Sequence, residues 1–198
     1  MDYESQIKKL TLSGNIDLAI QVAASVSFNI NRLFREILDS ISTPIIYLGG
    51  GRSLRAKVEN WLDCRILSCS SKSLTTLDVS SNTALTVLDC YNNELTTLDL
   101  SSNKALTNLY CSSNQLKKLD VSNNKALTVL YCSSNQLTKL DLSSNTTLTS
   151  LYCSSNQLTT LQLASNSKLT FINCRGNNFS ALEKGRIQAA VPNCKIAW

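Results

Sequence analysis

The sequence contains no histidine, although it is 198 residues long. Histidine is the side chain that most often serves as a general base near neutral pH, so the commonest catalytic base is absent. The many serines and threonines recur at regular intervals, and no candidate base is fixed beside any of them. The sequence therefore predicts a protein that is not an enzyme.

A Cys-x-x-Cys pair is also missing, although the chain has eight cysteines. Without histidine or paired thiols, the clustered ligand set of a zinc site is absent. Gly49–Ser53 is rich in glycine but has neither GxxxxGK[ST] nor GxGxxG spacing, so a flexible connection is favoured over a phosphate-binding loop. We expect neither a metal nor a cofactor.

Long apolar runs are the third absence. No stretch approaches the ~20 apolar residues of a membrane span, and Met1–Gly14 lacks the apolar region of a signal peptide. We expect a cytoplasmic protein that does not enter the membrane; export of a processed or effector form stays open. Its cysteines should be free thiols in that compartment. The net charge of +5 comes from scattered lysines, which does not favour nucleic acid as a partner.

What the sequence does contain is a repeat of 21 residues. Six cysteines mark it: Cys69, Cys90, Cys111, Cys132, Cys153 and Cys174. A fixed period of this length predicts a solenoid. Leu109-Tyr110-Cys111 alternates as a short strand with Tyr110 outward, and Leu119-Asp120-Val121 alternates in the same way. Too few residues remain for a helix, so we expect coils with a strand on a first wall and an extended segment on a second, stacked about 4.8 Å apart.

The repeated motif LxxLxCxxNxLxxLDLSxN, from Cys64 to about Asn178, resembles the bacterial 21-residue leucine-rich repeats in which one motif is nested within another. The resemblance implies a right-handed solenoid, here of about five to six coils, with a parallel sheet and little helix within the repeats. It also implies a binding or scaffolding role without catalysis. Because both walls are extended, we expect the solenoid to be nearly straight.

The complete chain is expected to be an α+β protein in three parts. Residues 1–63 are predicted to be a helical N-terminal cap region, residues 64–178 the solenoid, and residues 179–198 a C-terminal cap. Apolar residues spaced i, i+3, i+4 and i+7 between Ile30 and Ile41 indicate an amphipathic helix. Ile45–Leu48 indicates a short strand, and a further helix is expected from Ser53 to about Trp61. Whether residues 1–63 are only a cap or an independent module stays open.

The C-terminal cap is predicted in more detail. Ser180 followed by Glu183 is a capping box that opens a helix to about Ala190. The alternation of Cys194, Ile196 and Trp198 predicts a final strand at the open end of the solenoid. We expect Trp198 to fill that end.

Polar residues recur in columns along the repeats. Two columns of asparagine are expected to point inward and to bind backbone groups of adjacent coils. They are Asn93, Asn114, Asn135, Asn156, Asn177 and Asn82, Asn103, Asn124, Asn145, Asn166. An aspartate column on the second wall comprises Asp78, Asp99, Asp120 and Asp141. It allows calcium binding or local turn hydrogen bonds, and the neighbouring serines favour the turns.

The outward residues of the first wall are the candidate interaction face. Three stacked tyrosines are flanked by apolar residues, with a polar residue at each end of their column. The face comprises Tyr110, Tyr131, Tyr152, Val87, Val129, Phe171, Asp89 and Asn173. Two roles are open for the tyrosines: they support one another on the sheet without binding anything, or they form a contact surface.

The predicted function is a non-catalytic protein-interaction module or scaffold that acts as a monomer and binds a protein partner. The alternative is a glycan-binding or surface-binding, adhesin-like repeat protein. That alternative is suggested by a regular row of threonines, which turn hydrogen bonding explains equally well: Thr86, Thr107, Thr128, Thr149 and Thr170.

Overall fold

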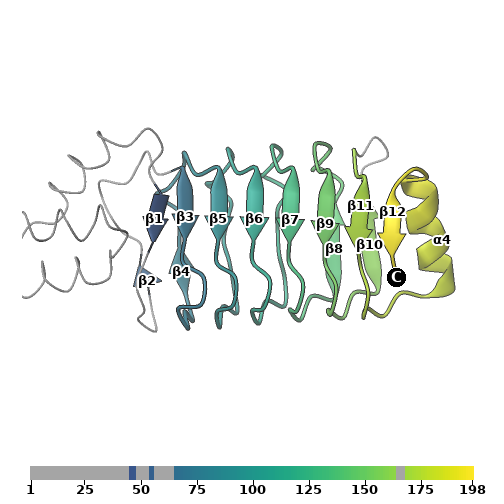
Figure 1. Cartoon of the computed structure of the whole chain (residues 1–198), viewed down its shortest axis with the longest axis horizontal. Coiled ribbons are helices and arrows are strands. Elements are labelled where there is room, and N and C mark those ends of the chain that lie inside the picture. Colours follow the sequence, from purple (N-terminus) through teal and green to yellow (C-terminus); the bar gives the residue numbers. More distant parts are fainter. Residues whose placement is uncertain (1–44, 48–53, 56–64, 164–167) are drawn as a thin grey trace, which may run out of the picture.

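The computed structural model describes residues 45–47, 54–55, 65–163 and 168–198. Its main feature is a parallel sheet of eight strands that lie side by side along the long axis of the molecule (Figure 1). This sheet is the first wall. Its strands, in spatial order, are β1 (Ile45–Tyr47), β3 (Ile66–Ser68), β5 (Val87–Asp89), β6 (Asn108–Tyr110), β7 (Val129–Tyr131), β9 (Ser150–Tyr152), β11 (Phe171–Asn173) and β12 (Lys195–Ala197).

The register of this sheet follows the sequence period. Leu88 pairs with Leu109, and Leu109 pairs with Leu130, so equivalent residues of successive repeats are neighbours. In the six first-wall strands β3, β5, β6, β7, β9 and β11 the middle residue is buried and the residues on either side are half-buried. The predicted alternation, with leucine inward and tyrosine outward, is confirmed.

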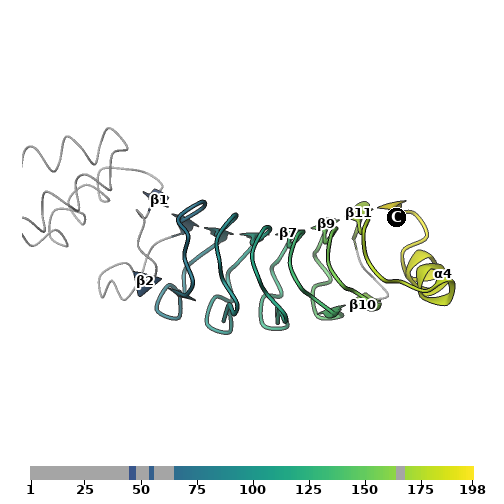
Figure 2. The same ribbon diagram turned by 90° about the horizontal axis from the view of Figure 1, so that it is seen from below.

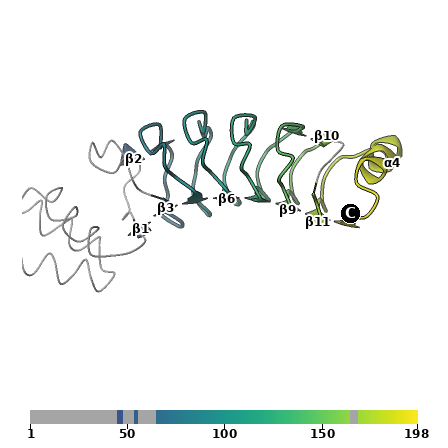
Figure 3. The same cartoon turned by 90° about the horizontal axis from the view of Figure 1, so that it is seen from above.

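The second wall is extended as well, but it is paired less regularly. It holds β4 (Leu77–Asp78), which pairs with β2 (Leu54–Arg55), and β8 (Lys139–Leu142), which pairs with β10 (Thr160–Leu163). No helix lies between residues 116 and 126, all of which the structure describes. Figures 2 and 3 show the coils edge-on, in an array that bends only slightly. The prediction of a nearly straight solenoid with two extended walls is confirmed.

The core lies between the two walls and consists of stacked leucines and of the six cysteines that mark the repeat, which we call the ladder cysteines. From Cys69 to Cys153 the ladder thiols have no exposed surface, and Cys174 is 2 % exposed. All six are free. Burial in this apolar column is the environment in which cysteine acts as a small hydrophobic residue.

The first asparagine column links adjacent coils, as predicted. In Asn135, Oδ1 accepts from the Leu116 N–H at 3.0 Å, and Nδ2 donates to the Cys111 and Cys132 carbonyls at 3.0 and 3.1 Å. The second column uses its amide nitrogens: Asn124 Nδ2 donates to the Leu100 and Asn103 carbonyls at 3.1 and 2.8 Å. These bonds satisfy backbone groups that the turns would otherwise leave unpaired inside the protein.

Helix α4 (Ala181–Ala190) covers the C-terminal end, and Ser180 is its N-cap as predicted. Ser180 Oγ accepts from the Glu183 N–H at 3.1 Å. The other half of the capping box differs, because the Glu183 carboxylate turns toward the solenoid. Its Oε1 accepts from the Leu161 N–H at 2.9 Å, and Arg186 Nη2 donates to the Leu161 carbonyl at 2.6 Å. The two side chains thus occupy both backbone groups of Leu161 on β10.

The prediction for Trp198 is wrong, although the predicted final strand is confirmed as β12. The Trp198 side chain is 37 % exposed and packs edge-on against Phe179, with ring centroids 6.3 Å apart. The end of the core is filled instead by Ile187 and Val191, which are buried beside Cys194. Helix α4 places these aliphatic side chains at the end of the core, so the indole packs outside them.

At the N-terminal side, the predicted strand at residues 45–48 is confirmed over β1, where Ile45 pairs with Ile66. The helix predicted from Ser53 is wrong at residues 54–55, because Leu54 pairs with Leu77 in a parallel ladder. Pairing with the free edge of β4 prevails over local helix propensity there. The sheet therefore begins within the predicted N-terminal cap region. The predicted helices before residue 45, Cys64 and the Gly49–Gly51 loop lie outside the described residues.

Within the part of the chain that the structure describes, no helix is both long enough and apolar enough to cross a membrane.

Candidate interaction surface

The central feature of the first wall is a row of four aromatic rings on its outer face. Tyr110, Tyr131 and Tyr152 occupy the last position of β6, β7 and β9, and their backbones pair directly. The ring centroids of Tyr110 and Tyr131 are 5.2 Å apart, and those of Tyr131 and Tyr152 are 4.2 Å apart. Phe171 continues the row at 5.2 Å from Tyr152. We call these four residues the aromatic strip.

The strip reaches solvent. All four rings are half-buried, because their inner edges pack on one another and on the sheet. Partial burial raises the pKa of Tyr131, and the neighbouring Tyr152 hydroxyl adds to that rise. The three tyrosines offer both an aromatic face and a hydroxyl for contact.

The structure places the other predicted residues on the same face. Val87 and Val129 are half-buried at the first position of β5 and β7, and Asp89 and Asn173 end β5 and β11. Asn108, between the two valines, donates from Nδ2 to the Tyr110 hydroxyl at 3.2 Å. All eight predicted residues thus lie on one continuous surface of the eight-stranded sheet.

A groove opens at the N-terminal half of this face. It has a volume of about 510 Å³ and is lined by Ile66, Ser68, Val87, Asp89, Tyr91, Tyr110, Ser112 and Tyr131. The sequence prediction missed Tyr91, which is 48 % exposed. Tyr91 follows Cys90 and lies outside strand β5, so the alternation of inward and outward residues makes no prediction for its side chain. One signal was available: Tyr91 stands in a column that holds serine in four other coils, at Ser70, Ser112, Ser133 and Ser154, and arginine at Arg175.

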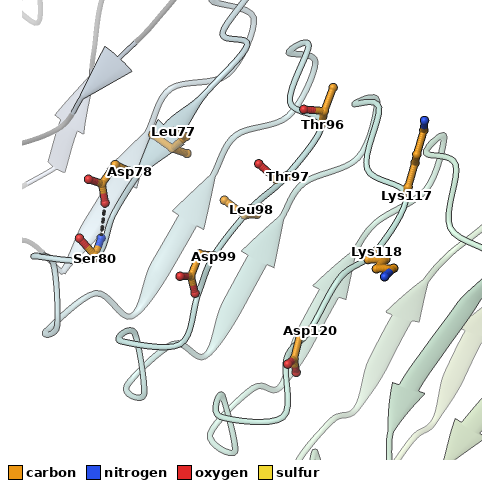
Figure 4. A pocket seen from close by; sticks show the side chains of 10 residues that line it. All are labelled: Leu77, Asp78, Ser80, Thr96, Thr97, Leu98, Asp99, Lys117, Lys118 and Asp120. Carbon is orange, nitrogen blue, oxygen red and sulfur yellow. Dashed lines mark hydrogen bonds between the residues drawn. The ribbon is translucent and has the colours of Figure 1, made fainter.

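A second groove, of about 720 Å³, lies on the second wall, where Figure 4 shows Asp78, Asp99 and Asp120 at equivalent places on three successive coils. Each aspartate accepts a hydrogen bond at Oδ1 from the backbone N–H two residues later, at 2.9 to 3.0 Å. This bond is the main reason why the pKa values of Asp99 and Asp120 are lowered, and the neighbouring aspartates oppose that shift at Asp99. The predicted turn role is confirmed.

The described residues contain no group of three or more histidine, cysteine, aspartate or glutamate side chains placed to hold a metal ion. Lys117 and Lys118 also line the second groove, so its aspartates share the groove with cations of the same chain.

Comparisons with known proteins agree with the repeat architecture. A family model described as leucine-rich repeats in two copies matches residues 125–165. No curated protein matches the chain. Among solved structures, a leucine-rich repeat protein of Leptospira interrogans matches with a TM-score of 0.63 and 23 % identity, over 83 % of this chain and 51 % of that one.

Two structures from Listeria monocytogenes also match. The functional domain of InlJ, whose description includes a cysteine ladder, is 35 % identical, with a TM-score of 0.54 over 68 % of this chain and 35 % of that one. An internalin, InlF, has a TM-score of 0.64 and 22 % identity over 77 % of this chain and 46 % of that one. The chain therefore spans about half or less of the length of these three structures.

The leucines, the ladder cysteines and the asparagine columns occupy the places that the nested motif requires, and the register of the sheet follows the 21-residue period. The chain is a leucine-rich repeat protein of the bacterial 21-residue class.

Proposed function

We propose that the chain is a non-catalytic protein-interaction module that binds a protein partner with the first wall. The observation that carries the proposal is the aromatic strip, in which four rings touch in sequence along β6, β7, β9 and β11. Tyrosine provides a large contact area at a low cost in conformational entropy and is enriched among the residues that dominate binding energy. One matching solved structure, with a TM-score of 0.59 and 23 % identity, is that of a complex, LRIM1/APL1C.

The fold does not require tyrosine at these positions. Ser68, Asp89 and Asn173 occupy the same column in β3, β5 and β11, and the sheet continues through them in unchanged register. Cohesion between coils comes from the inward leucines and the asparagine columns, which lie on the other side of the strands. The aromatic rings are therefore available for contact with another molecule.

The proposal is tested by replacing Tyr110, Tyr131 and Tyr152 together with serine, the residue found at position 68. We expect the thermal unfolding midpoint to change little. Binding to the partner, measured by quantitative pull-down and then by titration, should weaken by several kcal/mol, since such anchors contribute about 2 kcal/mol or more each.

The matched control is the double variant Lys117→Ser and Lys118→Ser, which changes exposed residues of the second wall. It should keep full binding. A triple tyrosine variant that melts earlier but still binds its partner would assign the strip a purely structural role. Capture of glycans instead of a protein would favour an adhesin-like function. The cytoplasmic location and monomeric state stay predictions.

A further inference from the structure

The groove beside the aromatic strip contains one charged group, the carboxylate of Asp89. Asp89 lies at the end of β5, between Ser68 on β3 and Tyr110 on β6, and its backbone pairs with both residues. Apolar side chains of Ile66 and Val87 lie at the other end of the same strands and also line the groove. A carboxylate thus stands at one end of an apolar channel bounded by tyrosine rings.

The position of the Asp89 carboxylate is fixed, but its charge is not neutralised. Oδ2 accepts from Ser68 Oγ at 3.2 Å, and Oδ1 accepts from the Tyr91 backbone N–H at 3.1 Å. Both donors are neutral, and among the residues that the structure describes no lysine or arginine forms an ion pair with Asp89. Each carboxylate oxygen keeps a lone pair for another donor.

The surrounding surface makes this charge exceptional. The outward positions of β3, β5, β6, β7, β9 and β11 hold, in two columns, Ile66, Val87, Asn108, Val129, Ser150, Phe171 and Ser68, Asp89, Tyr110, Tyr131, Tyr152, Asn173. Asp89 is the only charged residue among them, in a chain whose net charge is +5. The second wall differs, because its aspartates share their groove with lysines. Charge complementarity therefore points to a cationic group arriving from outside the chain.

The tyrosine rings that line the groove indicate which kind of cation would fit it. A guanidinium group is planar, forms two parallel hydrogen bonds with a carboxylate, and stacks on aromatic faces. Tyr91, two residues after Asp89, and Tyr110, which pairs with Asp89 across the sheet, both line the groove. The methylene stem of an arginine would lie along Ile66 and Val87 while its head reaches the carboxylate.

We propose that this groove binds an arginine side chain of the protein partner, with the guanidinium on Asp89 and against the tyrosine rings. The inference rests on the proposed function, because it assigns the groove as one anchoring point of the first-wall surface. It predicts that the partner contains a segment in which an arginine lies next to residues that pack on the aromatic strip.

The experiment uses the full chain, isotope-labelled, and the blocked peptide acetyl-Gly-Arg-Gly-amide. Titration is followed by NMR of the tyrosine rings and of the Val87 methyl groups. We expect saturable shifts at Tyr91, Tyr110 and Val87, and weaker binding of the same peptide with lysine. The peptide with citrulline, which keeps the shape but not the charge, should bind at least about tenfold more weakly.

Asp89→Asn is the informative variant, because its side-chain oxygen still accepts from Ser68 or Tyr91 and the fold is kept. It should weaken arginine peptide binding at least about tenfold. Asp120→Asn is the matched control: Asp120 also accepts from the N–H two residues later but lies on the second wall, so binding should be unchanged.

The inference is overturned if citrulline and arginine peptides bind alike, or if Asp89→Asn binds as well as the unmodified chain. Shifts confined to the second wall, or none at on the order of 10 mM peptide, would overturn it too. Loss of the partner in the tyrosine variant together with full retention in Asp89→Asn would leave the proposed function standing and remove only the arginine site.

Discussion

Single residues in the coils carry distinct thermodynamic roles, and the ladder cysteines are the clearest case. Burial raises the pKa of Cys69 and Cys111 from the ordinary 9.0 to about 12 and that of Cys174 to about 11, and it raises the pKa of Cys90, Cys132 and Cys153 as well. The thiols therefore stay protonated in the folded protein at a pH where the unfolded chain has lost those protons.

This difference makes the stability fall at alkaline pH. Below pH 9.0 both states hold the thiol protons, so the stabilisation is complete; between 9.0 and about 12 only the folded state holds them. Each fully buried thiol then removes about 1.4 kcal/mol from the free energy of unfolding per pH unit. We expect a steep loss of stability above pH 9, measured by urea unfolding.

Cys111→Ala should make that slope shallower by about 1.4 kcal/mol per pH unit, whatever it does to stability at neutral pH. A slope unaffected by this substitution would show that Cys111 is not a protonated core thiol. In the native state at neutral pH, a thiol reagent should label Cys111, Cys132 and Cys153 only slowly.

A second residue-scale feature is the left-handed turn that follows the six first-wall strands β3, β5, β6, β7, β9 and β11. Ser71, Asn92, Ser113, Ser134, Ser155 and Gly176 all have φ between 53° and 66°. This conformation suits glycine and asparagine but costs serine roughly 1 kcal/mol.

We expect Ser113→Asn, which copies Asn92 of the preceding coil, to stabilise the protein by about 0.5 kcal/mol. Gly176→Ala should destabilise it by about 1 kcal/mol, because φ is +66°; the new Cβ itself would make only an ordinary van der Waals contact with the Ser155 backbone at 3.5 Å. Thermal unfolding of both variants checks the pair. A gain from Gly176→Ala would contradict this account of the turn.

At the scale of elements, the coils are held together by two asparagine columns that are not equivalent. Asn135 both accepts and donates, whereas Asn103, Asn124 and Asn145 each carry a buried Oδ1 without a hydrogen-bond partner in the described structure. An unpaired buried oxygen cancels part of what the amide nitrogen contributes.

Asn135→Ala should therefore cost more stability than Asn124→Ala. The first substitution removes the acceptor of the Leu116 N–H, whereas the Cys111 and Cys132 carbonyls keep donors in Asn114 and Asn156. We expect a loss of about 2 kcal/mol. The second should cost roughly half as much. Urea unfolding curves of the two variants make the comparison, and equal costs would mean that the Oδ1 atoms of the second column are satisfied in solution.

At the scale of the whole molecule, the open ends decide whether a solenoid stays soluble, because each coil contacts only its neighbours. The C-terminal end is closed in two ways: β12 pairs with β11 on the first wall, and Glu183 with Arg186 occupies the backbone of Leu161 on the second.

Deleting residues 180–198 should therefore promote aggregation and lower the unfolding temperature by more than the lost contacts alone suggest. Size-exclusion chromatography with light scattering would detect the aggregates. The milder variant Arg186→Ala frees only one backbone group and should stay monomeric. A deleted chain that is monomeric and equally stable would show that this segment is not a cap.

Much of this architecture could be predicted from the sequence because it is periodic. The 21-residue spacing alone sets which leucines and cysteines face inward, and stacking then places each asparagine beside the backbone it satisfies. The aromatic strip follows from the same register, since residues one period apart must be neighbours. The helix at Ser180 was visible because its N-cap signal is local.

Only the tertiary structure decided the features that depend on contacts between segments outside the repeat pattern. Leu54 is in a strand because it pairs with the edge of β4. The Glu183 carboxylate accepts from the Leu161 N–H of the solenoid instead of completing the capping box. Trp198 stays outside because the helix already fills the end of the core. Tyr91 lines the groove although it lies outside the strand, and its backbone N–H donates to Asp89. Repetition fixes every contact between equivalent residues, whereas contacts between unlike residues depend on the packed shape of the folded chain.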